Sequence, residues 1–249
     1  MAINDRYFLM MQGIPIFFYT IPMQIYLLKL PLSSDVFAKN LELLKCYLHP
    51  SDYGLLSAKT NSQMLSAMGK ISVQYLYGRQ ASTQGSVYPL PFAYTKEGKP
   101  YLEGCSDFCF NISHTKEWVA VAVSNADVGV DIELLRTYKP TVAKRFFHPD
   151  EYSLLETLPP QLHDEMFTRL WTLKESYVKY TGTGIANNFD KFAISINLSG
   201  LRIKGNDSPV CFKQYNYDGL FVSVCSATDV FPGNIILLTI EEILHTVGN

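Results

Sequence analysis

Two acidic side chains, Asp131 and Glu133, stand two residues apart in an otherwise apolar run, Val128–Leu134. Such a run is typical of a β-strand, in which successive side chains alternate between the two faces. Both carboxylates are therefore expected on one face, with Val130 and Ile132 on the other. Like charges side by side repel unless water solvates them or a divalent cation lies between them, and ligands that are all oxygen favour Mg²⁺ or Mn²⁺. Taken alone, the pair is also consistent with a solvated edge strand.

A second group of charged residues follows Trp171 and consists of Lys174, Glu175 and Lys179. Residues 162–181 have the apolar spacing of a helix, and Glu175 and Lys179 are four apart, so they share a helix face. On an exposed face they would form an ordinary surface ion pair. Beside the two strand carboxylates, Glu175 would instead be a third metal ligand, and the two lysines would flank a bound polyphosphate.

Two further candidates are weaker when each is taken alone. Ser113 ends the strand-like run Phe108–Ser113 and His114 follows it, and both could donate hydrogen bonds to phosphate oxygens. No glycine-flanked elbow surrounds Ser113, which argues against a serine nucleophile. Gly98 and Lys99 form a turn with a lysine that would ordinarily be solvated.

The elements that must position these residues follow an order that repeats once. The first part of the chain contains a strand starting at Met23, a mainly helical region over 35–79, and strands at 108–113 and 118–123. After a turn, the second part contains a strand at 128–134, helices within 141–158 and 162–181, and strands at 192–196, 210–215, 220–225 and 235–240. This order predicts an α+β fold of two similar halves. We expect an N-terminal extension over 1–22, a first half over 23–125 and a second half over 126–249.

Composition narrows the classes of function. The 249 residues carry a net charge of −2, which argues against a protein that binds nucleic acid by its overall charge. Five cysteines without a metal-binding spacing predict free thiols in a reducing compartment, here the cytoplasm. Residues 7–28 are uncharged, but Pro15 and Pro22 interrupt them. An extension followed by a buried strand is therefore expected there, with membrane attachment as the alternative.

Together, these clusters form an ordered set of motifs. They are GKPY at 98–101, FNISHTKEWVAVAV at 110–123, VGVDIE at 128–133, RFFHPDEY at 145–152 and FTRLWTLKESYVKYTGTGI at 167–185. In this order and spacing the chain resembles the 4′-phosphopantetheinyl transferase superfamily, and within it the surfactin-synthetase-activating (Sfp) type. The resemblance covers about residues 94–196.

The resemblance implies a pseudo-twofold monomer with its active site between two α/β halves. It implies Mg²⁺-dependent transfer (Mn²⁺ is possible) of the phosphopantetheine arm of coenzyme A to a serine of an acyl or peptidyl carrier protein of polyketide or nonribosomal peptide synthesis, with release of adenosine 3′,5′-bisphosphate. The resemblance assigns Asp131, Glu133 and Glu175 as metal ligands, and Lys174 and Lys179 as contacts to the pyrophosphate. It assigns Ser113 and His114 as contacts to phosphate groups of coenzyme A, and Gly98 and Lys99 as a loop on the nucleotide side. Of these, Glu175 is the expected base, and Lys179 the residue at the leaving phosphate.

Two alternatives remain open from the residues alone. A Mg²⁺-dependent phosphodiesterase or nucleotide hydrolase would use the same carboxylates with water as the nucleophile. A degenerate, non-catalytic carrier-binding module would retain the fold only. Residues 49–65, where the resemblance places basic contacts to the 3′-phosphate of coenzyme A, contain only Lys59 as a basic residue. No residue is therefore assigned to that phosphate.

Overall fold

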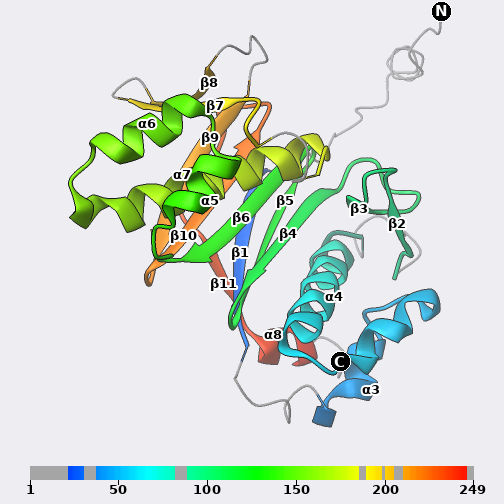
Figure 1. Cartoon of the computed structure of the whole chain (residues 1–249). Coiled ribbons are helices and arrows are strands. Elements are labelled where there is room, and N and C mark those ends of the chain that lie inside the picture. The colour runs from blue at the N-terminus through cyan, green and yellow to red at the C-terminus, as the bar shows by residue number, and fades with distance from the viewer. Residues whose placement is uncertain are drawn as a thin grey trace, which may run out of the picture.

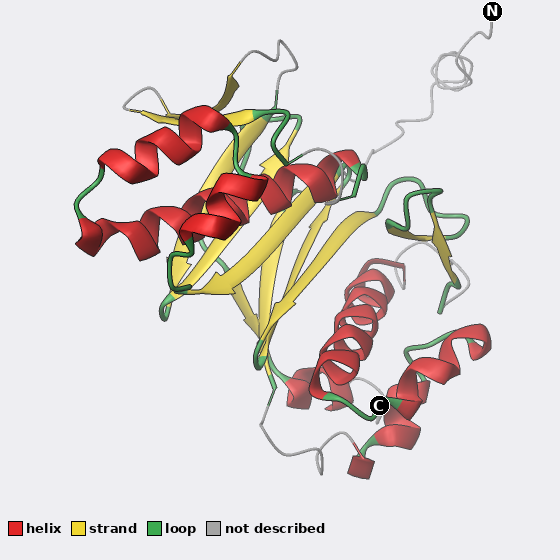
Figure 2. Cartoon of the chain, in the orientation of Figure 1, coloured by secondary structure: helices red, strands yellow, loops and turns green. Residues whose placement is uncertain are grey.

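Two β-sheets lie at the centre of the molecule, and helices cover the outer side of each sheet (Figure 1, Figure 2). This computed structural model describes residues 22–30, 38–81, 89–184, 189–197, 200–204 and 210–245. The arrangement is the α+β fold of two similar halves that the sequence predicts. Within the described ranges, no helix is both long enough and apolar enough to cross a membrane. The predicted extension over 1–22 lies outside the described residues except for Pro22.

The first sheet has the strand order β11-β1-β5-β4, in which β11 spans Ile236–Leu238, and the long helix α4 covers its outer face (Figure 1). Gly69 lets α4 approach β4 closely, because a Cβ there would lie 2.6 Å from a methyl carbon of Ile112. The elements of this half are β1 (Gln24–Lys29), α3 (Leu41–Lys45), the 3₁₀ helix η1 (Pro50–Ser57), α4 (Asn61–Ala81), β2 (Phe92–Tyr94), β3 (Pro100–Leu102), β4 (Cys109–Thr115) and β5 (Trp118–Ser124).

The second sheet has the strand order β6-β10-β9, with three helices on its outer side. Its elements are β6 (Val128–Leu134), α5 (Pro140–Phe146), α6 (Pro149–Thr157), the 3₁₀ helix η2 (Pro160–Leu162), α7 (His163–Thr181), β7 (Ala193–Asn197), β8 (Gly200–Lys204), β9 (Cys211–Tyr217) and β10 (Leu220–Ser226). His148 caps α6 in a capping box with Glu151, and Gly182 ends α7 with a φ of 71°. The end of α7 at Thr181 is the one that the sequence predicts. The hairpin β7–β8 extends beyond the prediction, which contains no strand at 200–204.

The two sheets pack against each other through their inner faces. Alternate residues of β1, β5, β6 and β10 point inward and form one apolar cluster between the sheets. Val130 and Ile132 belong to this cluster, so the residues between and after them, Asp131 and Glu133, point to the other side of β6. That other side is the one covered by α7, where Gly129 allows close contact.

The two halves also meet along β4 and β6, which lie side by side (Figure 1). Side chains of β4 bridge this junction. Asn111 Oδ1 accepts a hydrogen bond from the backbone nitrogen of Val130 at 2.8 Å. Two and four residues further along β4, Ser113 and Thr115 bond the two acids of β6. Because side chains alternate along a strand, every second residue of β4 faces β6.

The last described segment returns to the first half. β11 (Ile236–Leu238) pairs in parallel with β1, and α8 (Ile240–His245) buries Ile243 in the core of that half. The sequence predicts one strand over 235–240, whereas the structure ends the strand at Leu238 and begins a helix. The division near residue 126 falls in the turn between β5 and β6, but β11 and α8 lie with the first half rather than the second.

Candidate active site

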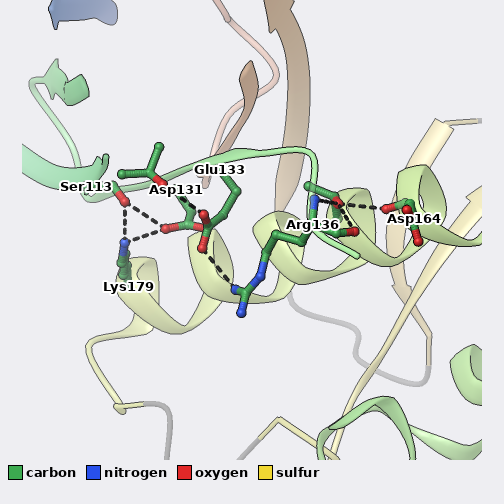
Figure 3. A network of polar contacts seen from close by, with 8 residues as sticks. Ser113, Asp131, Glu133, Arg136, Asp164 and Lys179 are labelled. Atoms are coloured by element: carbon green, nitrogen blue, oxygen red, sulfur yellow. Dashed lines mark hydrogen bonds and ion pairs between the residues drawn. The ribbon is translucent and has the colours of Figure 1, made fainter. Parts of the chain in front are cut away.

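Asp131 is the most enclosed acid of β6, with 5% of its surface exposed. Its Oδ1 accepts hydrogen bonds from Ser113 Oγ at 2.8 Å and from the Lys179 ammonium at 2.7 Å (Figure 3). Its Oδ2 is buried and has no hydrogen-bond partner among the described residues. One carboxylate oxygen of Asp131 is therefore paired with a cation and a hydroxyl, whereas the described residues satisfy no hydrogen bond of the other oxygen.

Glu133 lies two residues further along the same face of β6 and is half-buried. Its Oε2 accepts a hydrogen bond from Thr115 at 3.0 Å, and its Oε1 pairs with Arg136 at 3.0 Å (Figure 3). Burial raises the pKa of this carboxyl above its usual value, and the negative charge of Asp131 raises it further; Arg136 acts in the opposite direction. Glu133 is thus held by two partners, one of them a permanent cation.

Glu175 reaches the same site from α7. It is 6% exposed, and its Oε2 is a second buried carboxylate oxygen with no partner among the described residues. Burial, followed by the charge of Asp131, raises the pKa of Glu175 to about 7. Glu133 raises the pKa of Glu175 as well, so all three acids act on one another electrostatically. The structure therefore brings together the three acids that the sequence singles out.

Lys179 lies one helical turn after Glu175 and supplies positive charge to the site. Its ammonium donates to Asp131 and also to Ser113 Oγ at 2.9 Å, and its side chain is 26% exposed. His114, next to Ser113 on β4, is also close to this group. Burial lowers the pKa of His114, and the charge of Lys179 lowers it further, so the neutral imidazole is favoured.

The turn at Gly98 and Lys99 lies at the C-terminal end of α7. Gly98 has a φ of 90°, as a tight turn between β2 and β3 requires. The Lys99 ammonium donates to the carbonyl oxygen of Tyr180 at 3.0 Å and pairs with Asp127 at 3.3 Å. A cation at a helix C-terminus is favourable, because the last carbonyl groups have no partners within the helix. Lys99 therefore links the first half to α7, in contrast to the solvated lysine expected from the turn alone.

Lys174 differs from the prediction. Its ammonium is fully buried and lies 2.8 Å from Glu151 of α6, and it donates to the carbonyl oxygen of Phe192 at 2.6 Å. Successive residues of an α-helix point about 100° apart, so Lys174 cannot share the face of Glu175. The structure places Lys174 in the core of the second half and leaves Lys179 as the lysine at the acids.

Several residues of this site were missed by reasoning from the sequence. Thr115 and Arg136 hold Glu133, and the Arg136 guanidinium lies 4.6 Å from the ring centroid of Trp171. Glu151 is the partner of Lys174. One sequence signal pointed to Thr115, because it follows Ser113 by two and must share its strand face. For Arg136 and Glu151, the partner depends on how distant elements pack.

The donor atoms fit a hard divalent cation by their chemistry. Two buried carboxylate oxygens, on Asp131 and Glu175, have no hydrogen-bond partner in the part of the chain that the structure describes, and oxygen ligands are those that Mg²⁺ prefers. In the arrangement described, no group of three or more His, Cys, Asp and Glu side chains is placed to hold a metal among the described residues. Glu133 pairs with Arg136, and Lys179 occupies one oxygen of Asp131.

Comparison with known proteins identifies the family. A family model described as the 4′-phosphopantetheinyl transferase superfamily matches residues 127–225. A 4′-phosphopantetheinyl transferase of Bacillus subtilis is 33% identical over 159 residues, which are 62% of this chain and 71% of that protein. The 4′-phosphopantetheinyl transferase Sfp of Bacillus subtilis strain 168 is 32% identical over 181 residues, which are 71% of this chain and 80% of that protein.

A shorter stretch is more similar to the 4′-phosphopantetheinyl transferase HetI of a Nostoc species, at 43% identity over 101 residues, 38% of this chain and 43% of that protein. The crystal structure of Thermotoga maritima holo-acyl-carrier-protein synthase is 19% identical, with a TM-score of 0.34 over 40% of this chain and 61% of that chain. The chain belongs to the 4′-phosphopantetheinyl transferase superfamily. It is an enzyme of the holo-acyl-carrier-protein synthase type.

Proposed function

We propose that this enzyme transfers the 4′-phosphopantetheine arm of coenzyme A to a serine hydroxyl of an apo acyl or peptidyl carrier protein. The serine oxygen forms a bond to the phosphorus that carries the pantetheine arm. The bond from that phosphorus to the bridging oxygen breaks, and adenosine 3′,5′-bisphosphate leaves with the bond's electron pair. The observation that supports this most strongly is the convergence of Asp131, Glu175 and Lys179, with two buried carboxylate oxygens unpartnered among the described residues.

We propose that Asp131, Glu133 and Glu175 hold Mg²⁺, with Mn²⁺ as a possible substitute. When bound, the ion neutralises charge on the pyrophosphate and so stabilises the leaving group. Three carboxylates carry more negative charge than one dication can neutralise, so a polyphosphate needs further positive charge from the protein. Lys179 and Arg136 can supply this charge, because Lys179 pairs with Asp131 and Arg136 pairs with Glu133.

In this proposal, each remaining residue has a specific role. Lys179 donates to the departing phosphate, because its ammonium already lies at Asp131 and is partly exposed. Glu175 accepts the proton of the carrier serine, directly or through a water molecule, because it is the acid that α7 brings to the site. Ser113 and the neutral His114 donate hydrogen bonds to phosphate oxygens, and Gly98 and Lys99 line the nucleotide side. Lys174 is left out, because its ammonium is fully buried.

The test is a labelling assay over a panel of apo carrier proteins with coenzyme A and Mg²⁺. Transfer predicts a gain in carrier mass equal to one phosphopantetheine, together with release of adenosine 3′,5′-bisphosphate. Release of free phosphopantetheine without a labelled carrier would indicate a hydrolase instead. Carrier binding without any turnover would indicate a non-catalytic module. Asp131→Asn should reduce labelling by at least about 100-fold, and the exposed Asp229→Asn is the matched control.

The carrier panel should include carriers of fatty acid, polyketide, nonribosomal peptide and siderophore synthesis. We propose that the enzyme is a monomer, since one chain supplies both sides of the site. We also propose a cytoplasmic location, because all five cysteines are free thiols. No nucleic-acid partner is expected.

A further inference from the structure

A buried ion pair lies next to the candidate active site, on a different face of α7. Lys174 and Glu151 are 2.8 Å apart, and their side chains are 0% and 1% exposed. Lys174 precedes Glu175 in the chain, but it points about 100° away from it around the helix. The helix therefore presents Glu175 and Lys179 to β6 and presents Lys174 to the core of the second half.

This pair connects three elements through directional bonds. The Glu151 carboxylate also accepts hydrogen bonds from the backbone nitrogens of His148, at 3.0 Å, and of Ile194, at 2.6 Å. The Lys174 ammonium also donates to the carbonyl oxygen of Phe192. The start of α6, the middle of α7 and the start of β7 are thus joined at one point. Hydrogen bonds weaken steeply when their angle departs from linear, so this group requires one arrangement of the three elements. The apolar contacts around it have no such angular requirement.

The surroundings of Lys174 exclude an external anion. Its ammonium lies 3.9 Å from the ring centroid of Phe192, 5.7 Å from that of Phe189 and 6.0 Å from that of Phe147. An ammonium enclosed by rings, a carboxylate and a carbonyl group has its charge compensated inside the protein. A phosphate could reach it only if α7 or β7 moved out of the core.

We propose that Glu151 and Lys174 are a positioning pair that fixes the rotation of α7 about its own axis and thereby holds Glu175 and Lys179 toward β6. This inference rests on the proposed function, because it concerns the residues that function uses. A buried ion pair contributes little net stability compared with a well-packed apolar pair of the same size. Its effect is specificity, since only one rotation of the helix satisfies both charges.

Three variants and one control separate a positioning role from a ligand role. Lys174→Met removes the ammonium and leaves the Glu151 carboxylate buried alone. Glu151→Gln together with Lys174→Met removes both charges. Glu151→Gln alone completes the cycle. The control is Asp150→Asn with Lys204→Met, which removes the exposed ion pair between α6 and the β7–β8 hairpin. Asp150 directly precedes Glu151 in the chain.

The measurements are kcat, KM for coenzyme A and Tm, taken on a carrier that the wild-type enzyme labels. A positioning role predicts that Lys174→Met lowers kcat roughly 10- to 100-fold while KM changes less than about twofold. It predicts that the double variant regains most of the lost Tm, because no unpaired charge remains buried. Its kcat should stay low at a little-changed KM, because no directional pair fixes the rotation of α7. The control pair should keep the wild-type kcat.

Opposite outcomes would overturn the inference. A large rise in KM for coenzyme A at unchanged kcat, in Lys174→Met and equally in the double variant, would make Lys174 a substrate ligand. Unchanged kinetics in all variants would show that the pair positions nothing. If Lys174→Met does not fold, the double variant decides: a folded enzyme with lowered kcat at unchanged KM supports the proposal, and a wild-type kcat contradicts it. A wild-type enzyme that labels no carrier would instead refute the proposed function, and these variants would not be needed to show it.

Discussion

In the absence of a bound cation, the deprotonated carboxylate of Glu175 lowers the folding stability of the chain. Its carboxyl is buried near two other acids, and one of its oxygens has no hydrogen-bond partner among the described residues. A deprotonated carboxylate in such surroundings costs folding free energy, which an added cation or proton would remove. The site residues are therefore arranged for a ligand rather than for stability of the free chain.

Glu175→Gln should stabilise the cation-free enzyme at alkaline pH. The pKa of Glu175 is raised from 4.5 to about 7, so the folded chain binds this proton more tightly than the unfolded chain does. The stability from that proton is complete below pH 4.5 and is lost as the pH rises through 7. At pH 8 with a chelator, the variant should exceed wild type by about 2–3 kcal/mol in urea unfolding, and at pH 4 the difference should vanish.

The same variant should label no carrier, and added Mg²⁺ should stabilise wild type but not the variant. Equal unfolding free energies of the two proteins at pH 8 would contradict the raised pKa of Glu175.

Lys179→Ala should lower turnover far more than it lowers affinity for the carrier. Its ammonium contacts Asp131 and Ser113, where the pyrophosphate is proposed to bind, and removing a group that acts at the leaving oxygen costs about 100-fold in kcat. Steady-state kinetics with varied carrier separate the two quantities. Lys45→Ala, on α3 and paired with Glu42, is the control. A rise in the KM for carrier at constant kcat would exclude the proposed role.

The site depends on close packing between two elements, α7 and β6. Gly129 lies where α7 crosses the strand, and a Cβ there would lie 2.0 Å from the carbonyl oxygen of Ser176 and 2.4 Å from the nitrogen of Tyr180. Both atoms belong to helix backbone, which cannot move without shifting the whole helix. This glycine therefore sets the distance between the strand acids and Glu175.

Gly129→Ala should displace α7 and lower both stability and activity. Inserting a methyl group against backbone is expected to cost more than about 3 kcal/mol, the upper range for overpacking. Urea unfolding and the labelling assay measure the two effects. Gly54→Ala is the matched control, because a Cβ there meets no atom within 4 Å, and it should change stability by less than about 0.5 kcal/mol. A fully active and stable Gly129→Ala enzyme would show that this contact does not set the helix position.

For the whole molecule, the two halves are joined in more than one place. β4 and β6 meet through side-chain hydrogen bonds, Lys99 of the first half binds the end of α7, and the sheets share an apolar cluster. The C-terminal segment adds to the first half, because β11 pairs with β1 and the hydroxyl of Tyr47 donates to the carbonyl oxygen of Ile243. Residues near the end of the chain therefore stabilise the core formed near its beginning.

Ile243→Ala should destabilise the enzyme by about 2–5 kcal/mol, because it leaves a cavity in the first core. Ile243 is 0% exposed, although it lies close to the end of the chain. The matched control is Ile236→Ala on β11, whose side chain is 40% exposed, and this change should cost less than about 1 kcal/mol. Thermal or urea unfolding measures both. Similar losses for the two variants would argue against a buried role for α8.

Most local elements, and the strand and helix faces that carry the acids, could be predicted from the order of residues. The period of two over Val128–Leu134 placed Asp131 and Glu133 together, and the helical spacing placed Glu175 and Lys179 on one face. These features depend on backbone geometry within one element, which the local order of residues specifies. The ordered motifs were enough to indicate the family, and the comparisons confirm it.

Contacts between side chains of different elements follow from the folded chain and could not be predicted from its sequence. The tertiary structure turned Lys174 toward Glu151 and away from the acids, gave Glu133 its partners Thr115 and Arg136, and returned the C-terminal strand to β1. Contacts of this kind depend on how apolar faces pack when the whole chain folds. Neighbouring residues along the sequence do not specify that packing, because a buried face can be covered by any element of suitable shape.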